Sequence, residues 1–234
     1  MSEFENTVLK RTGRCLIFFI MLLLSNILKI NAQNIRFGIF ADPVIGWFSS
    51  DTRATVNDGA RAGFNFGFTF NKYFADNYSF STGLSIVTAG GRLYHRDTLT
   101  MEFNNLNVDI PPYKPVIYRI QYINLPLGLK FETNQIGYIT FFTDIGLDPK
   151  LVAGGKADIP FAGIKSETAI RELNRFNLGY HISGGLSYSL GGTTEIVAGL
   201  GYEKNFLDVT KDLHLQPDDR VTLNLMRFRI GINF

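Results

Sequence analysis

The chain has 234 residues, of which 45% are hydrophobic and 14% aromatic, and a formal net charge of +2 at pH 7. The excess of basic residues lies in the first 33 residues, which hold four Lys or Arg against two Glu. Beyond residue 33, Lys plus Arg falls from 23 to 19 and Asp plus Glu from 21 to 19, so the net charge is zero. This neutral remainder gives no electrostatic reason to expect nucleic-acid binding.

Residues 1–33 have the layout of a secretory signal peptide. A basic region that ends at Arg14 precedes an apolar run from Leu16 to Leu28, and the small residue Ala32 lies just before the expected cut. An uncleaved anchor is the alternative, but a spanning helix needs roughly 20 apolar residues. We therefore expect residues 1–33 to be cleaved and residues 34–234 to form the mature domain. Cys15 is the only cysteine, so the processed chain offers no disulfide.

After residue 33, large apolar residues alternate with small or polar ones, which is the period of a β-strand. From Phe64 to Phe70, for example, every second residue is Phe. Pro43 makes the first strand the least regular, Pro126 predicts a distortion, and a change of phase near Leu225 suggests a bulge. The pattern predicts eight strands: Ile35 to Phe48, Arg61 to Phe74, Tyr78 to Arg96, Tyr118 to Glu132, Ile136 to Asp148, Phe176 to Leu190, Thr193 to Asn205, and Arg220 to Phe234.

The connections between these strands alternate in length. Residues 75–77, 133–135 and 191–192 are tight turns, and longer polar segments are predicted at 49–60, 97–117, 150–174 and 207–219. Short turns at one end and long loops at the other are typical of outer-membrane barrels. Residues 111–115, Pro-Pro-Tyr-Lys-Pro, predict a stiff extended piece, either a ridge that binds a partner or a loop that only needs to be soluble.

No apolar run beyond residue 33 is long enough for a spanning helix, so a membrane protein of this sequence must be a closed barrel. A soluble ligand-carrying barrel would instead turn its apolar face inward. The Gly, Ser, Asn and Thr of the polar face suit a narrow interior, and the Phe, Leu and Ile of the other face suit lipid. We predict that residues 34–234 form an outer-membrane β-barrel domain, an all-β, eight-stranded, antiparallel, transmembrane up-and-down barrel whose first strand enters from the periplasm. Tyrosines near strand ends predict interfacial girdles: Tyr78, Tyr118, Tyr138, Tyr188 and Tyr202.

Charged residues on the polar faces are expected to line the interior and to pair there, because an unpaired buried charge costs roughly 3–5 kcal/mol. Glu195 and Glu203 are expected to pair with arginines of the last strand. We expect this network to plug the barrel, and a narrow channel for small solutes is the alternative. The predicted network comprises Lys130, Glu132, Asp144, Asp148, Glu195, Glu203, Arg227 and Arg229.

The sequence indicates neither a catalytic site nor a metal or cofactor site. His95, His181 and His214 fall in separate segments, whereas a metal site needs about four clustered ligands. An enzyme acting on lipid could pair His181 with Ser183 or Ser187 on the same strand face, but nothing supplies an oxyanion site. A polar interior explains these three residues better.

The stretch from Tyr122 to Phe131, Tyr-Ile-Asn-Leu-Pro-Leu-Gly-Leu-Lys-Phe, together with the terminal Phe234, resembles the outer-membrane β-barrel family that includes PorT-like proteins. The resemblance implies location in the outer membrane of a Gram-negative cell. It also implies that Phe228 and Phe234 belong to a terminal signal read by the barrel-assembly machinery. A part in protein secretion, through contacts with secretion-system proteins, would follow if the chain shared PorT's role.

Three kinds of function therefore stay open at this point. The first is a non-enzymatic protein that anchors, interacts or assists secretion through its outer loops, with outer-membrane lipid around it. The second is a narrow solute channel, and the third is a lipid-modifying enzyme. A secreted ligand carrier is a further alternative that cell fractionation would separate from these.

Overall fold

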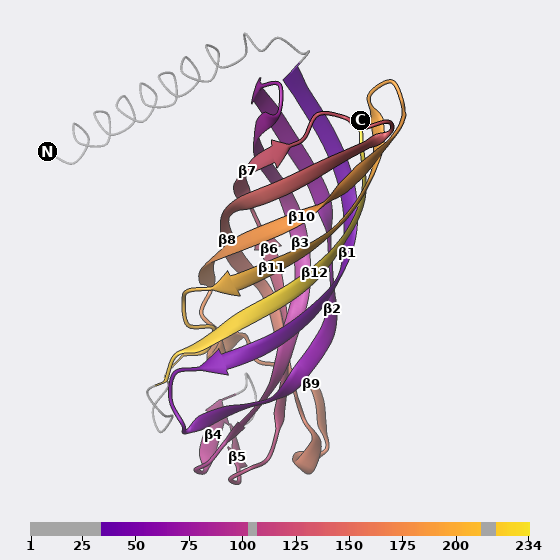
Figure 1. The fold of residues 1–234 in the computed structure, drawn as a ribbon. Helices are drawn as coiled ribbons and strands as arrows, with labels where there is room; N and C mark the ends of the chain where they lie inside the picture. Colours follow the sequence, from indigo (N-terminus) through magenta and orange to yellow (C-terminus); the bar gives the residue numbers. More distant parts are fainter. Residues whose placement is uncertain (1–33, 103–106, 212–218) are drawn as a thin grey trace, which may run out of the picture. The chain divides into compact units, whose positions relative to one another are not determined.

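The computed structural model describes residues 34–102, 107–211 and 219–234, so the expected signal peptide and His214 lie outside the described residues. Strands form almost all of the described chain (Figure 1). The barrel strands are β1 (Ile35–Ser50), β2 (Thr55–Ala75), β3 (Tyr78–His95), β6 (Val116–Asn124), β7 (Leu127–Glu132), β8 (Ile139–Ile159), β10 (Phe176–Gly191), β11 (Thr194–Asn205) and β12 (Val221–Asn233).

These strands form a closed antiparallel ring of eight, because β6 and β7 are two halves of one strand. Both halves lie between β3 and β8, and the break falls at the predicted Pro126, which has no N–H to donate. The ring closes where β1 pairs with β12, with Ile39 opposite Ile232. The predicted eight-stranded, all-β barrel is confirmed. Pro43 lies inside an unbroken β1, although the ladder to β12 is interrupted between Phe40 and Val44.

The two ends of the barrel differ. We call the end with the short connections and with Ile35 and Phe234 the turn end, and the opposite end, which carries β4 (Leu99–Glu102), β5 (Asn107–Ile110) and β9 (Ile164–Thr168), the loop end. Two predicted loops were too long. β1 and β2 are separated only by residues 51–54, and β8 continues to Ile159 rather than ending at Asp148. The start of β2 holds only Val56 and Ala60 as apolar residues, so it shows no apolar face. In the last part of β8 the apolar residues Ala157 and Ile159 face inward, so the outward apolar face does not continue.

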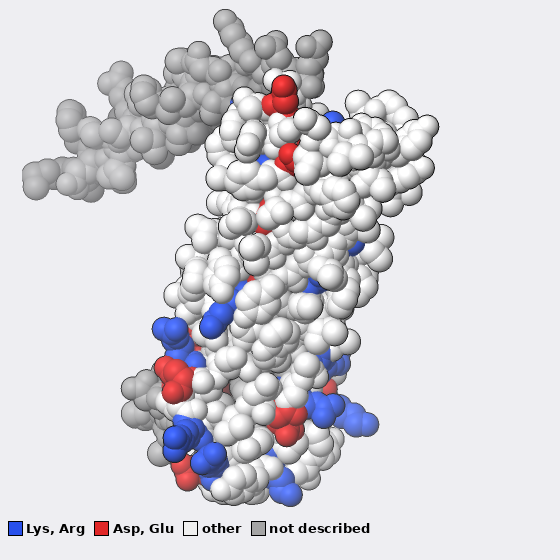
Figure 2. All heavy atoms as spheres, viewed as in Figure 1, with Lys and Arg blue, Asp and Glu red and all other residues white. Residues whose placement is uncertain are grey.

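A broad apolar band surrounds the turn half of the barrel. Outward side chains such as Phe66, Leu147 and Ile182 are 47–49% exposed. On β8 the outward positions run from Ile139 to Leu151, which corresponds to about 30 Å along the barrel axis at the usual strand rise and tilt. On the face that Figure 2 shows, this band carries few charged side chains, and most Lys, Arg, Asp and Glu lie towards the loop end, with a few at the turn end. The band has the height and chemistry of a lipid-facing surface. Among the described residues, no helix is long and apolar enough to cross a membrane.

Beyond this band the pattern inverts, and the apolar face points inward. The change is clear on β12, where Leu225 is completely buried and its neighbour Met226 is 39% exposed. The pairing of β12 with β11 stays in register through this point, from Tyr202 opposite Met226 to Glu203 opposite Leu225. The expected bulge is therefore wrong. The chain keeps its alternation, and the apolar residues move from the outward positions to the inward ones.

Tyrosines form a partial belt at the turn end. Tyr78, Tyr138 and Tyr188 are 43–65% exposed there, and the rings of Tyr138 and Tyr188 lie 5.8 Å apart between centroids. Tyr118 was wrongly placed in the girdle, because it is 3% exposed and packs inside the loop half. Tyr202 lies on the outer surface near the loop-end edge of the band, where its hydroxyl donates to Asn224 Oδ1 at 2.9 Å.

Candidate functional site

The interior of the turn half is filled by charged side chains that pair with one another. Near the turn end, Lys130 Nζ lies 2.6 Å from Glu132 Oε1, and the Tyr73 hydroxyl donates to Glu132 Oε2 at 2.5 Å. On the opposite wall, Arg36 Nη1 lies 2.8 Å from Glu195 Oε1. The first ion pair lies within β7, and Tyr73 of β2 reaches it past β3. The second ion pair joins β1 to β11 past the intervening β12.

A central group occupies the middle of the interior. Glu203 forms an ion pair with Lys150. It forms a longer one with Arg227, whose Nη1 lies 3.7 Å from Glu203 Oε2. Lys150 also donates to Asn205 Oδ1 at 3.3 Å. The side chains of Lys150 and Glu203 have no solvent exposure, so each depends on the other to offset the loss of water.

His181 lies beside this group and is held by two carboxylates. Its Nδ1 is 2.6 Å from Asp148 Oδ2, and its Nε2 is 3.5 Å from Asp144 Oδ1. Asn124 donates a further hydrogen bond to Asp148 Oδ1 at 3.1 Å. Because both ring nitrogens face carboxylates, neither is available as a base for a serine, as the lipid-enzyme alternative would require.

All eight residues of the predicted network lie on inward positions, but the predicted pairing is only partly right. Glu203 meets Arg227, whereas Glu195 pairs with Arg36, and Arg229 Nε lies 3.0 Å from Asp42 Oδ2. The reason is ring closure: β12 has β1 as its second neighbour, and β1 supplies Arg36 and Asp42.

Lys150 also belongs to this network, although the sequence pattern placed it in a predicted loop. Continuing the alternation of β8 by one more residue pair, past Asp148, would have found it. Within the described residues, no group of three or more His, Cys, Asp or Glu side chains is arranged to hold a metal ion.

The interior of the loop half is an apolar core. Its largest members include Phe48, Leu93, Ile120 and Tyr122, each 0–1% exposed. The β4–β5 hairpin adds Leu99, Met101 and Ile110 to this core, and the Tyr118 hydroxyl contacts Met101 Sδ at 3.8 Å. The two layers meet where Lys150 Nζ lies 5.7 Å from the centre of the Tyr122 ring. On the loop-end side of the polar layer, the barrel is therefore closed by a second, apolar layer.

Irregular segments complete the wall of the loop half, where β10 and β11 are too short to reach. The short 3₁₀ turn η3 (Ile170–Glu172) leads into residues 173–175, which lie beside residues 207–211. Backbone hydrogen bonds join Val152 N to Arg175 O, Asn174 N to Val209 O, and Val209 N to Val221 O, at 2.8–3.0 Å. These bonds close the gap between β8 and β12.

The loop end exposes aromatic and apolar side chains to water. Tyr113 is 65% exposed and has φ of 63°, so residues 111–115 make a turn and not the extended piece expected from three prolines. Its ring lies 5.9 Å from that of Tyr94. Phe161, in the 3₁₀ turn η2 (Pro160–Ala162), is 42% exposed.

The sequence profile of the outer membrane protein beta-barrel domain matches residues 31–225. The chain belongs to this family. Membership agrees with the closed ring and the apolar band, confirms the predicted barrel family and outer-membrane location, and excludes the secreted carrier. The PorT-like assignment within the family stays a prediction.

Solved outer-membrane barrels are also similar to the chain. Neisserial surface protein A has 12% identity and a TM-score of 0.47, over 84% of this chain and 95% of that one. Ail of Yersinia pestis has 14% identity and a TM-score of 0.41, over 86% and 100%. OprG of Pseudomonas aeruginosa has 14% identity and a TM-score of 0.42, over 85% and 95%. Comparison with curated proteins finds no match.

Proposed function

We propose that this protein is a sealed, non-enzymatic outer-membrane barrel that acts by presenting its loop end to a partner outside the cell. The observation that carries the proposal is the double filling of the interior. A charged layer crosses the turn half, and an apolar core closed by the β4–β5 hairpin fills the loop half. Water and ions would have to displace both layers to pass, so a channel function is disfavoured.

The conductance of the purified protein in planar bilayers tests the seal. We expect no steady conductance from the wild type. A variant with Lys150→Ser, Glu203→Ser and Arg227→Ser should stay closed as well, because the apolar core lies between the altered residues and the loop end. Removal of residues 97–114 in that variant should open a path for ions through the barrel and produce a steady conductance. A large, steady conductance from the wild type would contradict the proposal.

The loop end is the part of the molecule suited to a partner. Exposed aromatic side chains on a rigid scaffold are common anchors of protein interfaces, and Tyr113 and Phe161 are of this kind. The support for a non-enzymatic role is the environment of His181, both of whose ring nitrogens face carboxylates.

Affinity capture from mild detergent tests the interaction. The intact protein and a variant whose residues 97–114 are replaced by a short Gly-Ser linker should be compared. We expect a co-purifying protein with the first that is lost with the second. Recovery of secretion components would support the PorT-like role. Equal recovery with both proteins would show that the hairpin loop is not the binding surface.

A further inference from the structure

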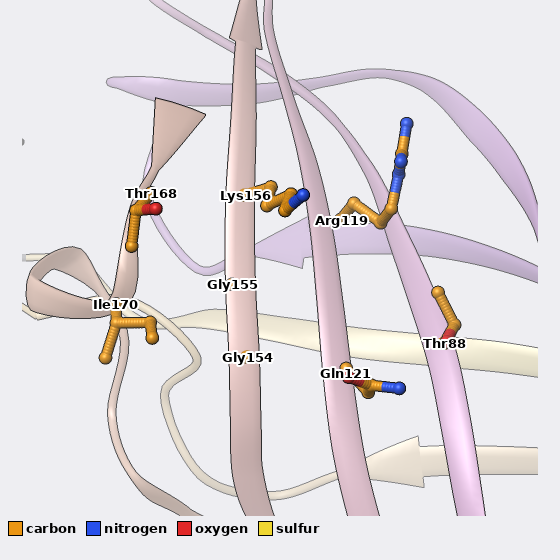
Figure 3. A pocket seen from close by; sticks show the side chains of 8 residues that line it. All are labelled: Thr88, Arg119, Gln121, Gly154, Gly155, Lys156, Thr168 and Ile170. Carbon is orange, nitrogen blue, oxygen red and sulfur yellow. The ribbon is translucent and has the colours of Figure 1, made fainter. Parts of the chain in front are cut away.

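A groove of about 310 Å³ opens on the outer surface of the barrel where β3, β6 and β8 lie side by side (Figure 3). Arg119 on β6 and Lys156 on β8 line it. Their chain neighbours Tyr118, Ile120 and Ala157 are buried in the apolar core. Because successive side chains of a strand point to opposite faces, Arg119 and Lys156 point outward.

The groove concentrates positive charge. Arg119 and Lys156 are direct cross-strand partners, and like charges in that arrangement repel each other. Neither forms an ion pair with the described part of the chain. Arg61 is near enough for the charges of Arg119 and Arg92 to act on it, and its own partner Asp158 is 3.8 Å away between Nη1 and Oδ2. A bound anion would relieve this repulsion.

The position of the groove indicates where that anion comes from. Ile123 and Leu151, also cross-strand partners, are 42% and 56% exposed and form the edge of the apolar band on β6 and β8. Arg119 lies four residues beyond Ile123, about 10 Å further along the barrel axis at the usual rise and tilt. Lipid headgroups begin directly beyond the hydrocarbon layer, so the two basic side chains lie at headgroup level.

We propose that this groove binds the phosphate group of an outer-leaflet lipid, with the acyl chains lying on the band below. Arg119 and Lys156 contact the phosphate, and Gln121, Thr88 and Thr168 provide hydrogen-bonding groups around it. A basic pocket at the headgroup level of a membrane protein is suited to anionic lipid. The proposal is independent of the seal and of any protein partner.

The test measures lipid retention by the folded barrel in nanodiscs that contain phosphorylated lipid A or its dephosphorylated form, with native mass spectrometry as the readout. The variant carries Arg119→Gln and Lys156→Gln. The control carries Arg53→Gln and Arg96→Gln, which remove the same charge from exposed positions at the loop end. Migration of unboiled samples on gels establishes that each protein is folded.

We expect the wild type and the control to retain phosphorylated lipid A equally, and the Arg119/Lys156 variant to bind it about 10- to 30-fold more weakly. With the dephosphorylated form, all three proteins should be alike. Equal retention by variant and wild type would overturn the proposal. Displacement of the lipid by an equal concentration of inorganic phosphate would also overturn it, because the groove would then be a site for soluble anions.

Discussion

The turn half and the loop half of this barrel are opposite in construction. In the turn half, Phe66 and Ile182 face outward and Lys150, Glu203 and His181 fill the interior. In the loop half, Arg119 and Lys156 face outward and Tyr118, Ile120 and Leu225 fill the interior. The same strands pass through both halves. The difference teaches that the surroundings decide which face is apolar: lipid around the turn half, and water around the loop half.

The largest effect is expected from breaking the charged layer. Lys150→Met leaves Glu203 buried with only the longer contact to Arg227, so the free energy of unfolding should fall by about 3–5 kcal/mol. Urea titration of the barrel in lipid vesicles measures the change. Adding Glu203→Gln should recover much of the loss, and Lys204→Met, at an exposed neighbouring position, should change stability by less than about 0.5 kcal/mol. A loss below about 1 kcal/mol for Lys150→Met would show that the layer is not structural.

The apolar core of the loop half gives the next effect. Leu225→Ala should lower the free energy of unfolding by about 2–5 kcal/mol, because it leaves a cavity in a packed interior. Met226→Ala, one residue further on and partly exposed, should cost less than half as much. The same urea titrations compare the two. Equal losses would mean that the two faces of β12 are not distinguished at this point.

The free energy of unfolding should depend on pH through His95, a buried residue of the loop half. His95 lies beyond the apolar band, where its Nδ1 and Thr55 Oγ1 are 2.8 Å apart, and burial lowers the pKa of His95 to about 4. As pH falls from about 6.5 to about 4, the unfolded chain takes up a proton at this position and the folded chain does not.

Stability should therefore fall over this pH range, by at most about 2–3 kcal/mol for this one group. His95→Gln should flatten the dependence, as measured by urea midpoints at pH 7, 5.5 and 4.5. An unchanged slope in the variant would assign the effect to other groups.

The smallest effect on stability is expected at Tyr113, an exposed residue of the loop end. Tyr113→Ser should change the free energy of unfolding by no more than about 0.5 kcal/mol, because the side chain is largely in water. If the loop end binds a partner, the same substitution should weaken the capture described above. A marked loss of stability would instead show that the Tyr94–Tyr113 contact holds the loop.

Period-two alternation by itself determined much of this protein. It predicted the number of strands, the lipid-facing side chains and the inward position of every member of the charged network, because alternation depends only on neighbours along the chain. It placed the turn after β7 at residues 133–135, whereas that connection runs over residues 133–138. Only the tertiary structure decided which charges meet. Arg36 and Asp42 reach Glu195 and Arg229 because the first strand closes the ring against the last, and no local pattern records that contact. The tertiary structure also decided the height along the barrel at which the lipid-facing band ends. That height places Tyr118 and Leu225 inside the barrel, because it depends on all the strands together.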